Sequence, residues 1–271
     1  MPGFIQITDT HIVAPGALAC GRSDTATALH EAVATINAHL PRLPHLDCAV
    51  ITGDLTDHGS AEEYKHFLQI MAALELPWLA VPGNHDSREA MRAALSGAPW
   101  MPADGPLHWS RNFGAFSLIG LDTLVEGKHH GAICDEGLAF LDEALSAIDD
   151  QPAIVATHHP YIPTGILAMD ADRLQGGARL MDRLEAHPGQ VRMISGHVHR
   201  AITAQIGRVT CQIAPATGHA VALDHRAGRE AGLTFEPGGV TLYRWITEPH
   251  PCLISDRIAL GEISGPWPFE S

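Results

Sequence analysis

Five short apolar segments of this 271-residue chain each end abruptly in Asp, His, Asn or Gly. The segments span 4–8, 48–52, 78–81, 153–157 and 192–195, and their lengths and apolar content predict buried β-strands. The polar runs that follow them are Asp9-Thr10-His11, Gly53-Asp54, Gly83-Asn84-His85-Asp86, His158-His159-Pro160 and Gly196-His197-Val198-His199. Because the loops after parallel strands converge at the carboxyl edge of the sheet, this pattern predicts one site built from all five runs.

Amphipathic stretches between these segments predict an α/β fold. Apolar residues recur at helical spacing over 28–40 and 135–148, and the pair Ser60 and Glu63 forms a capping box that starts a helix through 74. Further strands are predicted over 116–121, 201–206, 208–213 and 239–246, so the C-terminal part is rich in β-structure. We expect a layered sandwich, with sheets inside and helices outside, as a single domain over 1–271 with a C-terminal tail over 248–271.

Composition narrows the function classes. Asp and Glu outnumber Lys and Arg by 31 to 17, a net charge of −14, which disfavours a nucleic-acid partner. The 18 histidines favour a transition-metal site. Five cysteines are widely spaced and form no CxxC pair, so free thiols in a reducing compartment are expected. With no signal-peptide pattern and no long apolar run, we predict a cytoplasmic protein without a membrane partner.

The spacing of the polar runs fits metal coordination. In Asp9-x-His11 and His197-x-His199, residues two apart in an extended segment point the same way and can face one ion. Asp54 follows Gly53 on a predicted tight turn, where its two oxygens can bridge two ions. Carboxylate, imidazole and amide ligands suit Mn, Fe or Zn, and seven ligands around two ions leave open positions for water and substrate.

The ordered set DxH, GD, GNHD, HHP and GHxH resembles the calcineurin-like binuclear metallophosphoesterases, within them the cyclic-nucleotide and glycerophosphodiester phosphodiesterase branch. The narrower likeness rests on the direct Asp9-x-His11 start, the turn 216–219 that ends in His219, Met169-Asp170, and Gly265-Pro266-Trp267. The resemblance implies a four-layer αββα sandwich, the metallophosphoesterase fold, holding two divalent ions drawn from Mn, Fe, Zn and Co. It assigns Asp9, His11 and His199 to one ion, Asn84, His158 and His197 to the other, Asp54 to both, and His85 and His219 to the phosphoryl group as catalytic residues.

The same resemblance implies hydrolysis of small phosphodiesters, either glycerophosphodiesters or 3',5'-cyclic nucleotides, by attack of a metal-bound hydroxide. Two alternatives remain: a phosphomonoesterase such as a nucleotidase or a protein phosphatase, and a non-catalytic metal-binding scaffold. A homo-oligomer, a dimer or higher, is also expected, with the aromatic residues near the C-terminus on a neighbouring subunit.

Several other polar residues receive separate predictions. Asp57 is expected to brace the turn after Asp54, and Asp86 to orient a histidine of the metal site. His129 and His130 are expected on a solvated loop. Residues 160–177 are predicted to form a long loop over the site, with Asp170 contacting a hydroxyl of glycerol or ribose.

Overall fold

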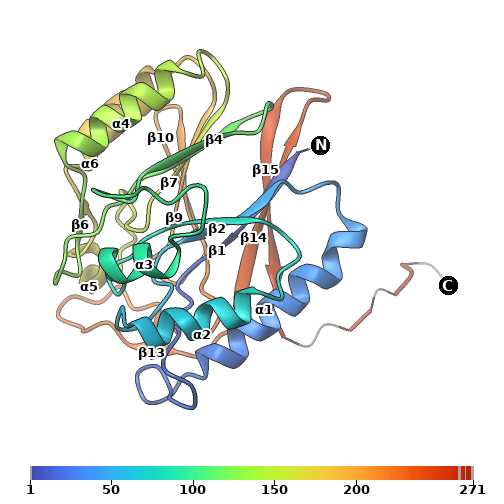
Figure 1. Cartoon of the computed structure of the whole chain (residues 1–271). Helices are drawn as coiled ribbons and strands as arrows, with labels where there is room; N and C mark the ends of the chain where they lie inside the picture. Colours follow the sequence, from blue (N-terminus) through green and yellow to red (C-terminus); the bar gives the residue numbers. More distant parts are fainter. Residues whose placement is uncertain (1, 262–263, 266, 270–271) are drawn as a thin grey trace.

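Two β-sheets stack face to face in the computed structural model of the chain, which describes residues 2–261, 264–265 and 267–269 (Figure 1). The first sheet has the order β15-β14-β1-β2-β3 and the second the order β10-β11-β9-β7-β5-β4. Strands of the first sheet are β1 Gly3–Ile7, β2 Cys48–Thr52, β3 Trp78–Val81, β14 Gly239–Ile246 and β15 Cys252–Ala259. Strands of the second are β4 Trp109–Asn112, β5 Ser117–Gly120, β7 Ala153–Ala156, β9 Val191–Ser195, β10 Ile202–Ile206 and β11 Val209–Ile213.

The central strands of each sheet run parallel, as the alternating pattern predicts. In the first sheet β1, β2 and β3 are parallel, and β14 and β15 are added antiparallel at one edge. In the second, β5, β7, β9 and β11 are parallel, and β4 and β10 close the edges antiparallel. Two short pairs join loops outside the sheets: β6 Gly131–Ala132 with β8 Leu174–Gln175, and β12 Ala220–Val221 with β13 Leu233–Thr234.

Helices cover the outer face of each sheet, which confirms the predicted four-layer αββα sandwich (Figure 1). The helices are α1 Thr25–His39, the 3-10 turn η1 Leu40–Arg42, α2 Ala61–Met71, α3 Arg88–Ala94, α4 Asp135–Ser146, α5 Leu167–Asp170 and α6 Gly177–Ala186. Apolar side chains of α1, α2 and α3 pack on the first sheet, and those of α4 and α6 on the second. The predicted capping box is present, because Ser60 accepts from the Glu63 amide and Glu63 accepts from the Ser60 amide.

Both faces of the central strands are buried, because each lies between a helix layer and the other sheet. In β1, Ile5 and Ile7 face the helices while Phe4 packs between the sheets, where its ring stacks on Tyr243. Gln6 also points between the sheets, and its amide donates to the Thr52 hydroxyl and to the Ser195 carbonyl. Replacing Phe4, Ile5 or Ile7 by Ala would lower the free energy of unfolding by about 2–5 kcal/mol.

Among the described residues, the longer elements that were not predicted are β4, α3 and β15. The short elements η1, α5, β6, β8, β12 and β13 were not predicted either. Strand β15 pairs with β14 along its whole length, so residues 252–259 belong to the first sheet rather than to the predicted tail over 248–271. Its sequence carries Asp256 and Arg257, because charged residues suit an edge strand. These charges interrupt the apolar pattern from which the other strands were predicted. The helix predicted through 74 ends at Met71. Within the described residues, no helix is long and apolar enough to cross a membrane.

Candidate metal centre

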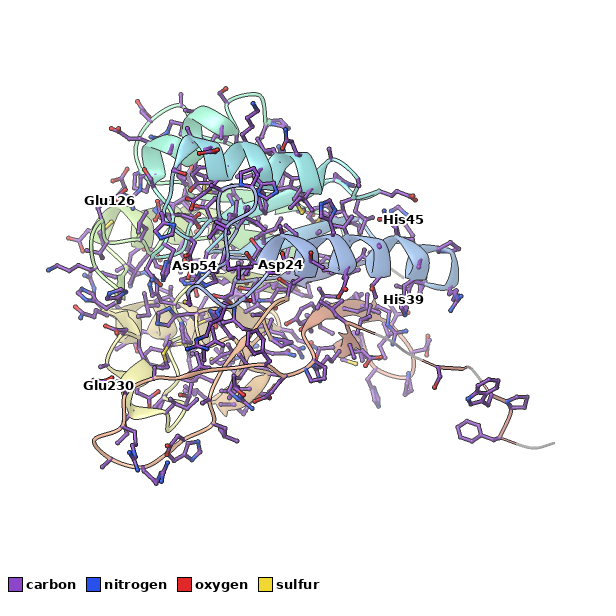
Figure 2. All side chains as sticks on the ribbon, turned by 90° about the horizontal axis from the view of Figure 1, so that it is seen from below. Asp24, His39, His45, Asp54, Glu126 and Glu230 are labelled. Carbon is purple, nitrogen blue, oxygen red and sulfur yellow. The ribbon has the colours of Figure 1, made fainter. Side chains whose placement is uncertain are left out.

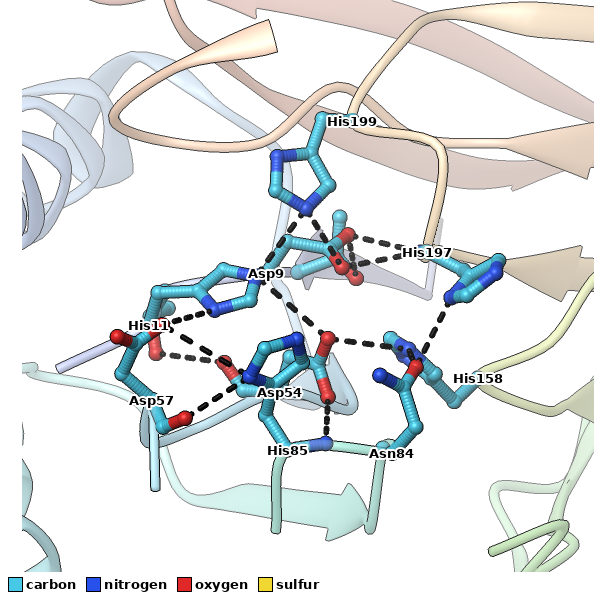
Figure 3. A network of polar contacts seen from close by, with 12 residues as sticks. Asp9, His11, Asp54, Asp57, Asn84, His85, His158, His197 and His199 are labelled. Carbon is cyan, nitrogen blue, oxygen red and sulfur yellow. Dashed lines mark hydrogen bonds and ion pairs between the residues drawn. The ribbon is translucent and has the colours of Figure 1, made fainter. Parts of the chain in front are cut away.

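The ends of β1, β2, β3, β7 and β9 bring all seven predicted metal ligands into one cluster (Figure 3). All of them except Asn84 are buried. The ligands are Asp9, His11, Asp54, Asn84, His158, His197 and His199. The convergence predicted from the five polar runs is therefore what the fold produces.

Backbone geometry, however, differs from the extended segments expected for Asp-x-His and His-x-His. Five of the ligands, Asp9, His11, Asp54, His197 and His199, have positive φ angles between 41° and 72°. A left-handed backbone at a residue other than glycine costs about 1–3 kcal/mol and persists where the surrounding structure enforces it. Sharp turns rather than strand alternation therefore direct these side chains inward.

One group of ligands gathers around His11 and His199. Their Nε2 atoms lie 3.1 Å apart, and His199 Nε2 lies 3.4 Å from an Asp9 carboxylate oxygen. Asp54 Oδ2 is 3.5 Å from His11 Nε2. Donor atoms this close, converging from separate loops, fit a single cation between them.

A second group gathers around Asn84. Its side-chain oxygen lies 3.1 Å from His158 Nε2 and 3.0 Å from His197 Nδ1. Asp54 Oδ2 is also 3.3 Å from His158 Nε2. The Asp54 carboxylate therefore belongs to both groups, which is the arrangement expected of a residue that bridges two ions.

Hydrogen bonds fix which nitrogen of three of these histidines faces the cluster. Nδ1 of His158 donates to the Thr52 carbonyl (2.8 Å), Nδ1 of His199 to the His219 carbonyl (3.1 Å), and Nδ1 of His11 to the Asp57 carboxylate (2.9 Å). Each ring therefore keeps its Nε2 lone pair for a ligand, as metal-binding histidines require. Oxygen and imidazole donors of this kind fit divalent transition ions.

The predicted role of Asp57 changes accordingly. Its carboxylate orients His11 rather than only bracing its own turn, and its backbone carbonyl accepts from His85 Nδ1 (2.8 Å). His159, by contrast, has both ring nitrogens engaged, one by the Thr123 hydroxyl and one by the His129 carbonyl. His159 is therefore a packed positioning residue and not a metal ligand.

Asp86 acts on loops rather than on a histidine, which corrects the prediction for this residue. Its carboxylate accepts from the backbone amides of Leu55, Thr56 and Gly83 at 3.1, 3.2 and 2.9 Å. The hydroxyls of Tyr64 and Thr56 add two more hydrogen bonds, of 2.9 and 3.1 Å. These bonds tie the loop of Asp54 to the loop of Asn84, so one buried carboxylate aligns ligands from two strands.

The pKa values of the cluster are set by burial and by the charges of neighbouring groups, above all the pair Asp54 and His158. Burial opposes charge on Asp54, but the neighbouring His158 outweighs it and holds the pKa of this carboxyl well below its usual range. Burial also disfavours a charged His158, yet Asp54 raises the pKa of this imidazole to about 9. Burial, reinforced by His11, lowers the pKa of His199 to about 3. The cluster thus holds negative charge that a proton, or a cation in its place, balances.

Five of the seven ligands line an open cavity of about 280 Å³: His11, Asp54, Asn84, His197 and His199. His85 and His219, the two predicted catalytic residues, line it. His85 is about one third exposed, and its Nδ1 is held by Asp57, so its Nε2 is available to a ligand. Burial and the neighbouring His199 lower the pKa of His219 to about 3, which keeps this imidazole neutral.

Other cavity residues escaped sequence reasoning. His129, expected on a solvated loop, is exposed but lines the cavity, with its ring centre 6.4 Å from that of His85. Cys20, Met169 and Asp172 also line it, together with residues of the β12–β13 pair. Met169 and Asp172 belong to the loop over 160–177 that was predicted to lie over the site. Cys20 and the β12–β13 pair had no such signal, because their loops acquire positions through tertiary contacts.

The loop over 160–177 differs from the prediction as well. It contains helix α5 and strand β8, and the Asp170 carboxylate accepts from the Thr164 amide and hydroxyl and from the Gly165 amide. Both oxygens of Asp170 are therefore used inside the loop, so the predicted contact of this residue with a substrate hydroxyl is not supported.

Residues 3–201 match the family model of the calcineurin-like phosphoesterases, and the chain belongs to this family. It is 33% identical over 266 residues to the "Probable glycerophosphodiester phosphodiesterase GpdQ" of Arcobacter nitrofigilis, covering 98% of this chain and 96% of that one. It is 34% identical to a "Probable cyclic nucleotide phosphodiesterase" of Rhodopseudomonas palustris, covering 96% and 92%. The fold is similar to that of a dimetal phosphatase from Danio rerio (TM-score 0.62, 13% identity), over 95% of this chain and 98% of the other.

Proposed function

We propose that this metallo-phosphodiesterase hydrolyses small phosphodiesters, either glycerophosphodiesters or 3',5'-cyclic nucleotides, with two divalent ions. One observation carries the proposal: the Asp54 carboxylate is shared by two ligand groups and lines an open cavity. The names of the two relatives cited above support both substrate types.

Asp9, His11, Asp54 and His199 would hold one ion, and Asp54, Asn84, His158 and His197 the other. When bound, such ions supply Lewis acidity toward a phosphoryl group and lower the pKa of water at neutral pH. The residues of the chain itself set the geometry, because the hydrogen bonds to His11, His158 and His199 hold their rings in one orientation.

His85 and His219 are proposed to bind phosphoryl oxygens above the ligands. His85 is anchored through Nδ1, which donates to the Asp57 carbonyl and leaves Nε2 free. As an imidazolium, His85 would donate its Nε2 proton to the departing alcohol. His219 is held beside Ser23, whose hydroxyl lies 3.2 Å from its Nδ1. Replacing His85 by Ala should lower turnover by about a hundredfold or more while metal content stays unchanged.

The experiment is to reconstitute the protein with Mn²⁺, measure bound metal by elemental analysis, and compare bis(p-nitrophenyl) phosphate with p-nitrophenyl phosphate. We expect two equivalents of metal and faster hydrolysis of the diester. His197→Ala should lose one equivalent and most activity, whereas His45→Ala, with its side chain 79% exposed and far from Asp54, should lose neither (Figure 2). A single equivalent would contradict the two-ion proposal, and a faster monoester reaction would indicate a phosphomonoesterase.

We also propose a homo-oligomer with the C-terminal aromatic residues at or near the contact. Trp267 and Phe269 are largely exposed, and large exposed rings favour an interface. Pro266 and residues 262–263 and 270–271 lie outside the described part of the chain. Deleting 264–271 should lower the mass measured in solution, and an unchanged mass would remove this segment from the contact.

The five cysteines are all free thiols, which supports the proposal of a reducing compartment such as the cytoplasm.

A further inference from the structure

Part of the cavity wall is apolar. Met169 at α5 and Ala220, Val221 and Leu233 of the β12–β13 pair form it. A phosphoryl group must lie against the ligands, so this wall is where an alcohol group of a diester substrate would extend. Its residues come from loops that no sequence motif of the metal site includes.

One carboxylate, Asp172, interrupts this apolar wall. Three carboxylates line the cavity, and two of them have partners: Asp54 faces His11 and His158, and Asp57 accepts from His11. Over the described part of the chain, the Asp172 carboxylate accepts no hydrogen bond and forms no ion pair. An unpaired negative group beside an apolar surface is typical of a site for a polar or cationic ligand.

The chain holds Asp172 in place through its neighbours. Its backbone amide donates to the Met169 carbonyl, and Leu174, two residues on, is buried and donates to the Pro160 carbonyl. The Arg173 guanidinium donates to the Asp170 carbonyl, and the Asp170 carboxylate accepts from the Thr164 amide at the start of the loop. Asp172 therefore sits on a braced loop, not on a free one, which is what a residue that selects ligands requires.

We propose that Asp172 determines specificity for one alcohol group of the substrate, favouring an alcohol that bears an ammonium group over a neutral alcohol of the same shape. The inference rests on the proposed phosphodiesterase function. The carboxylate attracts a positive charge and repels an anionic alcohol, while Met169 and Leu233 contact the hydrocarbon part. Asp172, rather than Asp170, would then carry the role that the sequence suggested for this loop.

The test uses two chromogenic diesters that share p-nitrophenol and differ in one charge. One is p-nitrophenyl phosphocholine, and the other is its isostere with an uncharged alcohol group, p-nitrophenyl 3,3-dimethylbutyl phosphate. In both, water attacks phosphorus, the bond to p-nitrophenol breaks, and the released p-nitrophenolate is measured. Asp172→Asn should lower the choline-to-neutral ratio of kcat/KM about fivefold, the equivalent of about 1 kcal/mol for a partly exposed charge pair.

Salt provides a second measurement. Raising the ionic strength should reduce the ratio in the unmodified protein, because a solvent-accessible charge pair is screened, and should leave the ratio of Asp172→Asn nearly constant. Bound metal, measured in parallel, should be equal in both proteins, since Asp172 belongs to neither ligand group.

Glu230→Gln is the matched control, since it removes the same single charge from an exposed position outside the cavity. Figure 2 shows Glu230 well apart from Asp54, on the loop that joins β12 to β13. Its ratio should stay at the unmodified value. An unchanged ratio in Asp172→Asn, or an equal loss in Glu230→Gln, would overturn the inference. If the unmodified, metal-loaded protein hydrolyses neither these diesters nor bis(p-nitrophenyl) phosphate, the proposed function itself fails.

Discussion

Replacing Asp86 by Ala tests whether a single buried carboxylate aligns the metal loops. The change leaves four buried donors without an acceptor: the backbone amides of Leu55, Thr56 and Gly83, and the Thr56 hydroxyl. The Tyr64 hydroxyl also loses Asp86 but keeps the Ser87 carbonyl at 3.4 Å. An unsatisfied buried donor costs about 1–3 kcal/mol. Taking about 1 kcal/mol for each of the four donors predicts a loss of about 4 kcal/mol in the free energy of unfolding. For a chain of this size, that loss lowers the melting temperature by about 8–16 °C.

Chemical denaturation of the metal-free protein measures the loss without any contribution from bound ions. Tyr64→Phe is the mild control, because it removes one of the five hydrogen bonds to Asp86 and should cost about 1–2 kcal/mol. A titration with Mn²⁺ should show weaker metal binding for Asp86→Ala, since the loops of Asp54 and Asn84 are no longer tied together. A destabilisation below about 1 kcal/mol would refute the idea that the hydrogen bonds to Asp86 hold the two loops together. Normal metal affinity despite lost stability would mean that other contacts align the two loops.

Three further predictions concern single positions. Gly83→Ala should weaken metal binding, because a Cβ at this position would collide with the Asp54 carboxylate that the two ligand groups share. Gly97→Ala should leave metal binding unchanged, because a Cβ there meets open space. A metal titration of both variants measures the difference. Burial raises the pKa of the Cys48 thiol to about 12, so at pH 8 it should resist a thiol reagent that modifies exposed Cys134 readily, and equal reaction rates would contradict this. Asp170→Ala should speed proteolysis within its own loop by leaving two amides without an acceptor, and an unchanged cleavage rate would show that the loop is held elsewhere.

The sequence alone was sufficient for the framework of the fold. Strands β1, β2, β3, β7 and β9 are short, apolar and bounded by turn residues, and being buried on both faces they gave clear signals. Strand β15 did not, because one of its sides is exposed at the edge of the sheet and carries charged residues. Helix α3 was missed because seven residues span only two turns, too few for a clear apolar period.

The sequence also predicted which residues meet in the cluster, because Asp, His and Asn directly after buried strands have few positions to occupy other than the shared carboxyl edge. Tertiary structure decided how they meet. Left-handed turns at Asp9 and His199, and the hydrogen bonds to Asp86, depend on contacts between loops far apart in the chain, so local sequence carries little trace of them. The cavity wall depends most on tertiary structure, because Asp172 and the β12–β13 pair line one cavity although they belong to separate loops. The length of the 160–177 loop predicted that it lies over the site, but no local spacing predicts which of its residues line the cavity.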